Sequence, residues 1–191
     1  MKNFQEGFYP VTEIELKKEE QYVKLLKDIC AQLFQIHQKG AVHADIHKEN
    51  IYLQVIEGEE KYILIAPKGL KRNGEKEVPL SDAYQWKDSV YAPEYRRNCF
   101  KGIPVIYNPG LDLYSMMIVF YQLLTSQKPS LNFRNNKMWK MVMEQYMMEW
   151  KEETKRAILG IFFQCTRTNS SQRWRNVMDL MDSELYQALK S

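Results

Sequence analysis

Residues 43–50 read His-Ala-Asp-Ile-His-Lys-Glu-Asn, a polar stretch between two segments of regular pattern. Before it, residues 18–38 repeat apolar side chains at helical spacing, and Lys39-Gly40 supplies a helix end. After it, residues 51–56 and 61–65 are rich in β-branched and aromatic residues and are separated by Glu-Gly-Glu-Glu. The pattern predicts a helix, a polar loop, and a hairpin with a four-residue turn.

The rest of the chain is expected to be mostly helical. Residues 66–91 carry prolines, glycines and many charges, which predicts a long loop, and loops of this length are commonly functional. Helical spacing returns at about 111–125, 136–149, 152–165 and 173–188. The predicted class is mainly α within α+β, with one small β-hairpin.

Composition excludes several kinds of protein. Among 191 residues, 27 Lys and Arg stand against 24 Asp and Glu, a balance that does not indicate nucleic-acid binding. No dinucleotide fingerprint, P-loop, H-E-x-x-H or G-x-S-x-G motif is present. Cys30, Cys99 and Cys165 are too scattered for a disulfide framework. The most apolar run, 111–124, is short for a bilayer span, so we expect a cytoplasmic protein that binds neither membrane nor nucleic acid.

The 43–50 stretch resembles the protein-kinase catalytic loop, H-R-D-x-x-x-x-N. Further landmarks follow in the family's order: Ala92-Pro93-Glu94 matches A-P-E, Asp112-Leu-Tyr-Ser115 resembles D-x-W-S, and Arg173 matches the Arg that pairs with the A-P-E Glu. The resemblance implies a kinase C-terminal-lobe-like helical domain over residues 18–191, with 66–94 as an activation-segment-like loop.

The resemblance also implies roles for single residues. Asp45 would be the base for a substrate hydroxyl, and Asn50 would offer an amide oxygen to Mg²⁺. His43 would hold the loop to the metal-binding motif, and Asp112 would accept hydrogen bonds from backbone N–H groups of the loop. Glu94 and Arg173 would form a buried ion pair.

The chain also departs from the kinase pattern. Only 17 residues precede the first predicted helix, which leaves no room here for an N-lobe with its glycine-rich loop and strand Lys. Ala66 or Pro67 stands where the Mg²⁺-binding Asp is expected. Ala44 replaces the loop Arg, and His47 replaces the Lys that neutralises the transferred phosphoryl group. We therefore expect a degenerate kinase, a pseudokinase half that needs no cofactor.

Three functions remain open at this stage. The first is a non-catalytic interaction or regulatory module, which binds a protein partner or a second copy of itself across the face normally covered by the N-lobe, with residues 1–17 as another candidate cover. The second is a Ser/Thr kinase-like phosphotransferase that uses Asp45 and Asn50 with ATP, Mg²⁺ and an N-lobe supplied in trans. The third is a helical regulatory protein unrelated to kinases, which gains if Glu94 and Arg173 do not pair.

Purely structural roles could also account for the same side chains. Asp45 and Asn50 can serve a purely structural loop, since Asx side chains commonly bond to backbone groups. His43 is most simply a buried, hydrogen-bonded residue, and His47 is either solvated or in contact with a substrate or partner. The basic residues of the long loop fit a solvated surface, and Ser81, Ser89 and Tyr91 are candidates for modification.

Overall fold

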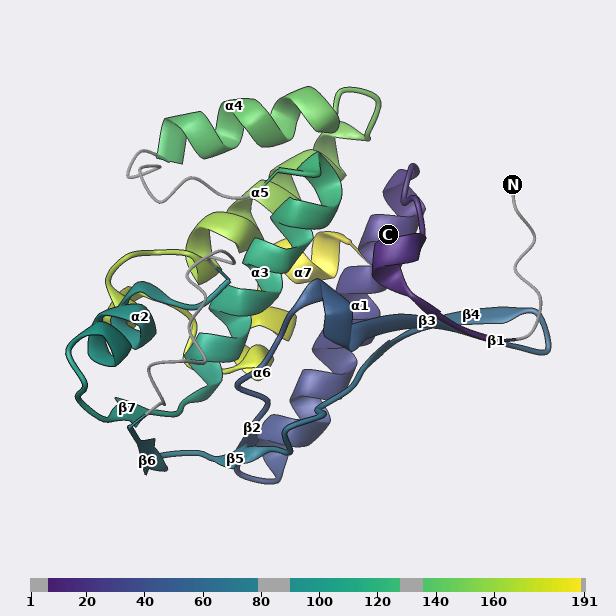
Figure 1. The fold of residues 1–191 in the computed structure, drawn as a ribbon. Coiled ribbons are helices and arrows are strands. Elements are labelled where there is room, and N and C mark those ends of the chain that lie inside the picture. The colour runs from purple at the N-terminus through teal and green to yellow at the C-terminus, as the bar shows by residue number, and fades with distance from the viewer. Residues whose placement is uncertain (1–6, 79–89, 128–135, 190–191) are drawn as a thin grey trace.

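Helix α3 (Pro109–Thr125) runs through the middle of the molecule, and the other long helices pack around it (Figure 1). The computed structural model describes residues 7–78, 90–127 and 136–189. Every residue of α3 from Pro109 to Tyr121 is buried, as its almost unbroken apolar sequence requires. The helix begins where the Asn108 side chain accepts a hydrogen bond from the Gly110 N–H, with Pro109 in the first turn.

Helix α1 (Glu19–Gln38) agrees with the predicted helix to within one residue. Its first turn is closed by Gln21, whose side chain accepts from the backbone N–H groups of Lys17 and Lys18. It ends before Gly40, which has a φ of 68° and so takes the left-handed conformation common at helix ends. One stripe faces the core: Tyr22, Leu25, Leu26, Ile29, Cys30 and Leu33.

A three-stranded antiparallel sheet of order β1-β3-β4 projects from the helical body (Figure 1). It consists of β1 (Gly7–Pro10), β3 (Ile51–Ile56) and β4 (Glu59–Leu64). The expected four-residue turn is wrong, because only Glu57 and Gly58 connect the strands. Both have positive φ, 52° and 80°, which is the two-residue geometry that matches the twist of a hairpin. Pairing thus continues to Glu59 opposite Ile56.

Residues 7–16 form part of this structure. Strand β1 adds to the hairpin beside β3, so the expectation of a hairpin alone is corrected. A 3₁₀ turn follows at Val11–Glu13, in which Val11 is buried, and Ile14 and Leu16 pack against the core. Phe8 lies on the outer face of the sheet, where its ring stacks on Tyr52 at 4.5 Å. Residues 1–6 of the proposed N-terminal cover lie outside the described residues.

Helix α1 closes the far edge of this sheet with two polar side chains. Asp28 accepts from the backbone N–H of Tyr62 at 2.9 Å. Gln32 donates to the Tyr62 carbonyl at 2.8 Å and accepts from the Leu64 N–H at 2.9 Å. Asp28 and Gln32 are one helical turn apart, so both reach β4 from the same side of α1. These contacts satisfy backbone groups that an edge strand otherwise leaves unpaired.

The predicted long loop contains more structure than expected. Short strands pair β2 (Ala41–Val42) with β5 (Lys71–Arg72) and β6 (Lys76–Glu77) with β7 (Val105–Ile106). Helix α2 (Pro93–Phe100), which the sequence reading did not anticipate, begins inside the Ala92-Pro93-Glu94 motif. Residues 79–89, with the modification candidates Ser81 and Ser89, lie outside the described residues.

Residues 136–189 contain four α-helices in place of the three expected after α3. They are α4 (Asn136–Tyr146), α5 (Glu152–Cys165), α6 (Val177–Met181) and α7 (Glu184–Ala188). The single helix predicted over 173–188 is wrong because two caps divide it. Asn176 accepts from the N–H groups of Met178 and Asp179, and Ser183 accepts from that of Tyr186. Each side chain starts a new helix.

The starts of α1 and α5 are tied together by one side chain. Glu19 accepts from the backbone N–H of Lys151 at 2.8 Å and from the hydroxyl of Thr154. A carboxylate at a helix N-terminus satisfies N–H groups that have no partner within the helix. Helix α1 is also joined to α3, since the Tyr22 hydroxyl donates to the Leu123 carbonyl at 3.1 Å. Among the residues described, no helix is both long and apolar enough to cross a bilayer.

Candidate functional site

The 43–50 loop lies between β2 and β3 and is anchored by Asp112 of α3. The Asp112 carboxylate accepts from the N–H groups of His43 at 2.7 Å and Ala44 at 2.8 Å, the contacts that the sequence analysis expects. Ala44 has a φ of 62°, so the loop turns sharply at the point where Asp112 holds it. Asp112 is only 1% exposed, which makes these hydrogen bonds strong and their loss costly.

His37, from the last turn of α1, joins the same anchor. Its Nε2 lies 3.0 Å from the Asp112 Oδ2 atom, and both side chains are buried. No sequence motif assigns a role to His37. The available signal is its position four residues after the buried Leu33, which places it on the inward-facing stripe of α1.

His43 fastens the loop to the end of β4. Its Nε2 lies 2.9 Å from the Ile65 carbonyl, and its Nδ1 accepts from the Asp45 N–H at 3.3 Å. One donor and one acceptor nitrogen fit a neutral imidazole. Burial agrees with this assignment, because it lowers the pKa of His43. His43 therefore has a holding role, next to the segment where the family carries its metal-binding motif.

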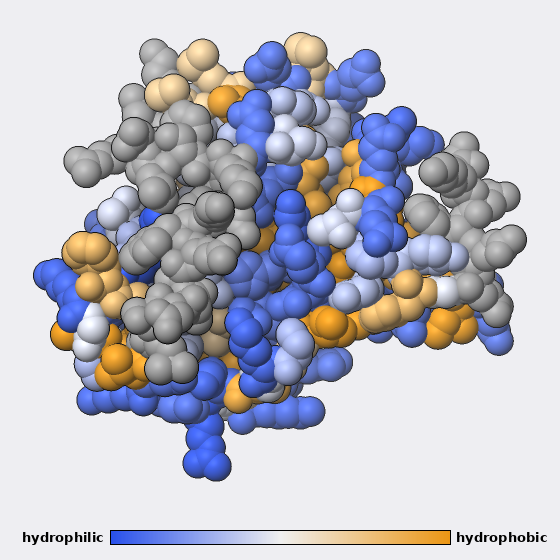
Figure 2. Space-filling view, viewed as in Figure 1, coloured by the Kyte–Doolittle hydropathy of each residue, from blue (hydrophilic) through white to orange (hydrophobic). Residues whose placement is uncertain are grey.

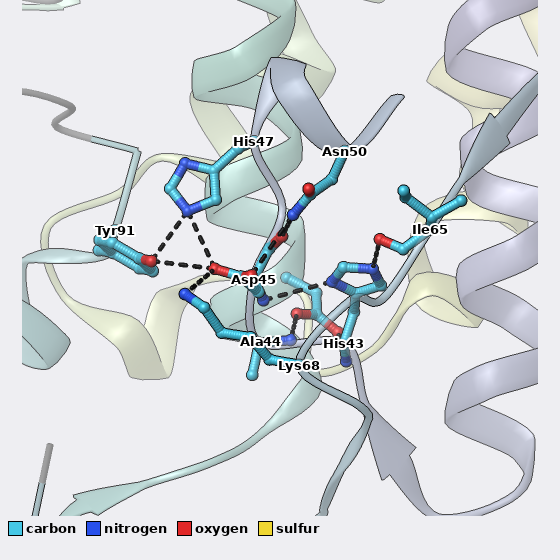
Figure 3. Close-up of polar contacts among 9 residues, drawn as sticks. His43, Ala44, Asp45, His47, Asn50, Ile65, Lys68 and Tyr91 are labelled. Carbon is cyan, nitrogen blue, oxygen red and sulfur yellow. Dashed lines mark hydrogen bonds and ion pairs between the residues drawn. The ribbon is translucent and has the colours of Figure 1, made fainter. Parts of the chain in front are cut away.

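Asp45 is the centre of the site, and several donors converge on its carboxylate (Figure 3). The Oδ1 atom lies 3.1 Å from the His47 Nε2, 3.2 Å from the Tyr91 hydroxyl and 3.4 Å from the Lys68 Nζ. The Asn50 amide donates to the Asp45 carbonyl at 2.8 Å and approaches its Oδ2 at 3.4 Å. Burial raises the pKa of Asp45, but the hydrogen bonds and charges of His47 and Lys68 outweigh it and lower the pKa to about 2.

Tyr91 and Lys68 are the two contacts to Asp45 that the sequence does not predict. The Tyr91 hydroxyl also lies 2.8 Å from the His47 Nε2. The Tyr91 ring stacks on Tyr95 of α2 with 4.8 Å between centroids, and the His47 ring meets it edge-on at 5.2 Å. Burial and the nearby charge of Asp45 raise the pKa of Tyr91. The phenol therefore stays protonated and acts as a donor.

These residues do not fit a Mg²⁺ site of the kinase kind. Magnesium prefers oxygen ligands, usually with one or two carboxylates. The segment that follows β4 offers Ala66 and Pro67, and its next side chain brings an ammonium group to Asp45. Asn50 points its amide nitrogen toward Asp45. Residues 7–78, 90–127 and 136–189 contain no group of three or more His, Cys, Asp or Glu placed to hold a metal.

Glu94 and Arg173 form a second centre, which joins α2 to the segment before α6. The Arg173 guanidinium donates to both carboxylate oxygens of Glu94, at 2.6 and 2.9 Å. It also donates to the carbonyl of Arg167 at 2.6 Å and lies over the Tyr114 ring at 4.9 Å. The Arg173 side chain is 1% exposed, so its charge depends on these partners.

The structure thus brings together the predicted residues of the loop and its anchor, namely His43, Asp45, His47, Asn50 and Asp112. It adds His37, Lys68 and Tyr91, which the sequence analysis treated as unassigned, solvated and modifiable residues respectively. Lys68 and Tyr91 come from the long loop, where no periodic pattern predicts a direction for a side chain. Tyr91 is the link between the site and the ion-paired segment that contains Glu94.

Comparisons with known proteins agree on one family. The family model "protein tyrosine and serine/threonine kinase" matches residues 12–181. Over 110 residues the chain is 27% identical to serine/threonine-protein kinase Pkn1 of Myxococcus xanthus, which covers 56% of this chain and 15% of that protein.

Two solved structures from Toxoplasma gondii are similar in fold, each with a TM-score of 0.62 over 89% of this chain. One is a rhoptry kinase, 13% identical and 47% covered. The other is ROP2, 15% identical and 44% covered, described as a virulence factor with a protein-kinase fold and no enzymatic activity. The chain spans less than half the length of each of these three proteins. Because the family model matches most of the chain, the protein belongs to the protein tyrosine and serine/threonine kinase family.

Proposed function

We propose that this chain is a non-catalytic, pseudokinase-like module that acts by binding a protein partner. The observation that carries the proposal is the contact between Lys68 and Asp45, 3.4 Å between Nζ and Oδ1. In the family, the segment after the hairpin brings a carboxylate to the metal at the catalytic loop. Here the same segment brings a positive charge to the only carboxylate of the loop that faces the site.

The charges around Asp45 disfavour phosphoryl transfer. Phosphoryl transfer depends on cations that neutralise the phosphates, with a base that receives the hydroxyl proton. A divalent ion beside the Lys68 ammonium would meet repulsion, and Asn50 would be its one family ligand in the loop. Losing a single electrostatic contributor typically lowers a catalytic rate by about 10²–10³-fold. The proposed module therefore requires neither ATP nor Mg²⁺.

The outer face of the projecting sheet is the surface we propose for the partner. Phe8, Tyr52, Ile56 and Ile63 alternate with inward-facing residues along paired strands, so they share this face. Phe8 is 47% and Ile56 55% exposed. Figure 2 shows hydrophobic residues gathered along the sheet. Gln54, Glu59 and Lys61 share this face with them. Exposed apolar side chains rimmed by polar ones mark interaction sites, and a second copy of the chain is the other candidate occupant.

Thermal unfolding with nucleotide tests the absence of catalysis. With Mg²⁺ or Mn²⁺ and ATP present at about 100 times a typical Kd, a true site would stabilise the protein by about 2.7 kcal/mol. For a chain of this size that corresponds to a shift of roughly 5 °C or more. We expect no shift. A shift that disappears in Asp45→Asn or Asn50→Asp would contradict the proposal.

A second candidate function keeps one observation in its favour. The anchoring of the loop by Asp112 and His43 is complete, and the low pKa of Asp45 keeps its carboxylate ionised at neutral pH. A phosphotransferase that obtains an N-lobe in trans would use this geometry. Phosphate transfer from labelled ATP to a generic protein substrate in the presence of an added kinase N-lobe, abolished by Asp45→Asn, would favour this candidate over the first.

Sedimentation velocity tests the partner surface. If the sheet face joins two copies, the sedimentation coefficient rises with protein concentration and Phe8→Glu abolishes the rise. Glu20→Gln is the control, because it changes an exposed residue at the start of α1. If the chain is monomeric at all concentrations, the proposed partner is a different protein. The binding of that protein should be weakened by Phe8→Glu and not by Glu20→Gln.

A further inference from the structure

One corner of the molecule combines exposed apolar side chains with basic ones. Helix α2 ends there beside the short strands β6 and β7, on the other side of the helical body from the projecting sheet (Figure 1). We propose that this corner binds the surface of a bilayer that contains anionic lipids. The proposal goes beyond the proposed function, since it concerns another face of the molecule and another kind of partner.

The apolar side chains of this corner point outward. Phe100 at the end of α2 is 79% exposed, and Ile106 of β7 is 51% exposed. Ile106 pairs with Lys76 of β6, so these two side chains lie on the same face of the ladder, whereas the neighbouring Val105 points the other way and is buried. Ile103, in the connection from α2 to β7, is also exposed. Figure 2 shows hydrophobic residues at this corner with hydrophilic ones around them.

Four basic side chains accompany the apolar ones. Arg97 and Lys101 are exposed at the end of α2, one helical turn apart and beside Phe100. Arg72 of β5 and Lys76 of β6 are exposed on either side of the turn that joins these strands. Within the part of the chain that the structure describes, none of the four forms an ion pair.

The acidic residues of the same segments are already engaged. Each carboxylate accepts from a donor of this chain: Glu75 from the Arg72 N–H, Glu77 from the Lys71 ammonium, and Glu94 from the Arg173 guanidinium. Residues 66–78 and 90–106 contain no other Asp or Glu. The corner therefore keeps its positive charge, and its complement is a negatively charged surface outside the chain.

The shape and composition of the corner favour a lipid surface over an acidic protein. Phe100 and Ile106 project from the end of a helix and from the outside of a two-stranded ladder, whereas proteins recognise peptides in grooves or along free strand edges. Lysine is depleted at protein interfaces, yet it supplies two of the four cations here. Apolar side chains that dip among lipid headgroups, with basic ones beside them, are typical of surface-bound segments.

Such binding needs no membrane-spanning segment. The expectation that the chain binds no membrane rests on the lack of a long apolar run, which bears on a span and not on a surface contact. Each basic side chain close to an anionic bilayer raises binding by about fivefold. The ion pair of Glu94 with Arg173 fixes the first turn of α2, so the corner is held in place before it meets the bilayer.

Vesicle sedimentation at physiological ionic strength provides the direct test. We expect binding to vesicles of phosphatidylcholine mixed with phosphatidylserine to be at least about tenfold tighter than to phosphatidylcholine alone, and to weaken as salt is added. Arg97→Gln/Lys101→Gln should lower the affinity by about tenfold or more, because two cations are lost. Lys17→Gln/Lys140→Gln is the matched control: it removes the same charge from exposed sites elsewhere and should change the affinity by less than about twofold.

The apolar side chains are tested separately. Phe100→Ser/Ile106→Ser should weaken binding to the phosphatidylserine vesicles by about fivefold or more, because less apolar surface enters the headgroup layer. Both side chains are exposed, so the melting temperature should stay close to that of the wild type. Met141→Ser/Met148→Ser, which replaces two exposed apolar residues elsewhere, should leave vesicle binding unchanged.

Three results would overturn the proposal. The first is no binding to phosphatidylserine vesicles, and the second is an Arg97→Gln/Lys101→Gln variant that binds as tightly as its control. The third is polyglutamate that binds as tightly as the vesicles at equal negative charge, with the same sensitivity to both pairs of substitutions, which would assign the corner to an acidic protein. None of these results bears on nucleotide binding, so this proposal and the proposed function can fail separately.

Discussion

Arg173 and Glu94, 79 residues apart in the sequence, hold each other through two parallel hydrogen bonds of 2.6 and 2.9 Å. The pair fastens the first turn of α2 to the segment that precedes α6. Because α2 begins two residues after Tyr91, whose hydroxyl contacts Asp45, the same pair also limits how far Tyr91 can move. A single ion pair thereby couples the packing of the C-terminal helices to the candidate site.

Substitution of Arg173 should be severe. Arg173→Ala strands the Glu94 carboxylate and removes the donor from the carbonyls of Arg167 and Thr168, and such losses cost about 3 kcal/mol or more. For a chain of this length the melting temperature should fall by about 6–12 °C. Arg175→Ala, two residues away and exposed, should change stability by about 0.5 kcal/mol at most. Equal, small losses in both variants would argue against a buried pair.

The Asp45 site should contribute to acid unfolding. Its pKa of about 2 in the folded state lies below the unfolded value of about 3.9, so the contribution is complete above the unfolded value. It is lost as the pH falls from about 5 to 2, because the unfolded chain takes up the proton first. Discounted for the exposure of Lys68, it amounts to about 1–2 kcal/mol.

Urea unfolding at a series of pH values checks this expectation. Asp45→Asn should flatten the stability curve between about pH 5 and 2 relative to the wild type. Glu49→Gln removes an exposed carboxylate from the same loop, whose nearest cation, Lys48, is 3.9 Å away, and should leave the curve unchanged. An Asp45→Asn curve parallel to that of the wild type would be inconsistent with the hydrogen bonds described here.

The attachment of α1 to strand β4 should depend on the hydrogen bonds of Gln32. Gln32→Ala removes the partners of the Tyr62 carbonyl and the Leu64 N–H, at a cost of about 1–3 kcal/mol. Hydrogen exchange at the Leu64 amide should accelerate, since this proton loses its acceptor. Gln35→Ala on the exposed side of α1 is the matched control and should leave the Leu64 amide protected. Identical exchange in both variants would show that water replaces Gln32 without loss.

The parts of the fold that follow a local rule could be predicted from the sequence. Helices α1, α3 and α5 were predicted to within about two residues because one apolar stripe or one continuous apolar run determines each. Asn176 is a capping residue that ends the preceding segment and starts α6. The apolar spacing continues across it, so the pattern predicted a single helix there. Strand β1 was missed because four residues with one proline carry too little pattern.

Part of the candidate site, the residues of the 43–50 loop and its anchor, could be predicted for a similar reason. The loop residues stand in one short motif, so Asp45 and Asn50 could be placed together with Asp112 by resemblance. Tyr91 and Lys68 reach Asp45 from 46 and 23 residues away, through a segment with no periodicity. Nothing in the sequence orients such side chains, since their direction follows from the packing of α2 and from the hairpin that ends at Leu64.

The bond from Glu19 to the start of α5 has a consequence for the newly made chain. Glu19 and Lys151 are separated by 132 residues, which a ribosome needs on the order of ten seconds to add. Helices α3 and α6, which pack against α1, also come later in the chain, so part of the apolar stripe of α1 stays open to other chains while they are made. We therefore expect this protein to depend more on chaperones when translation between α1 and α5 is slow. Synonymous codons that slow this interval should lower its soluble yield.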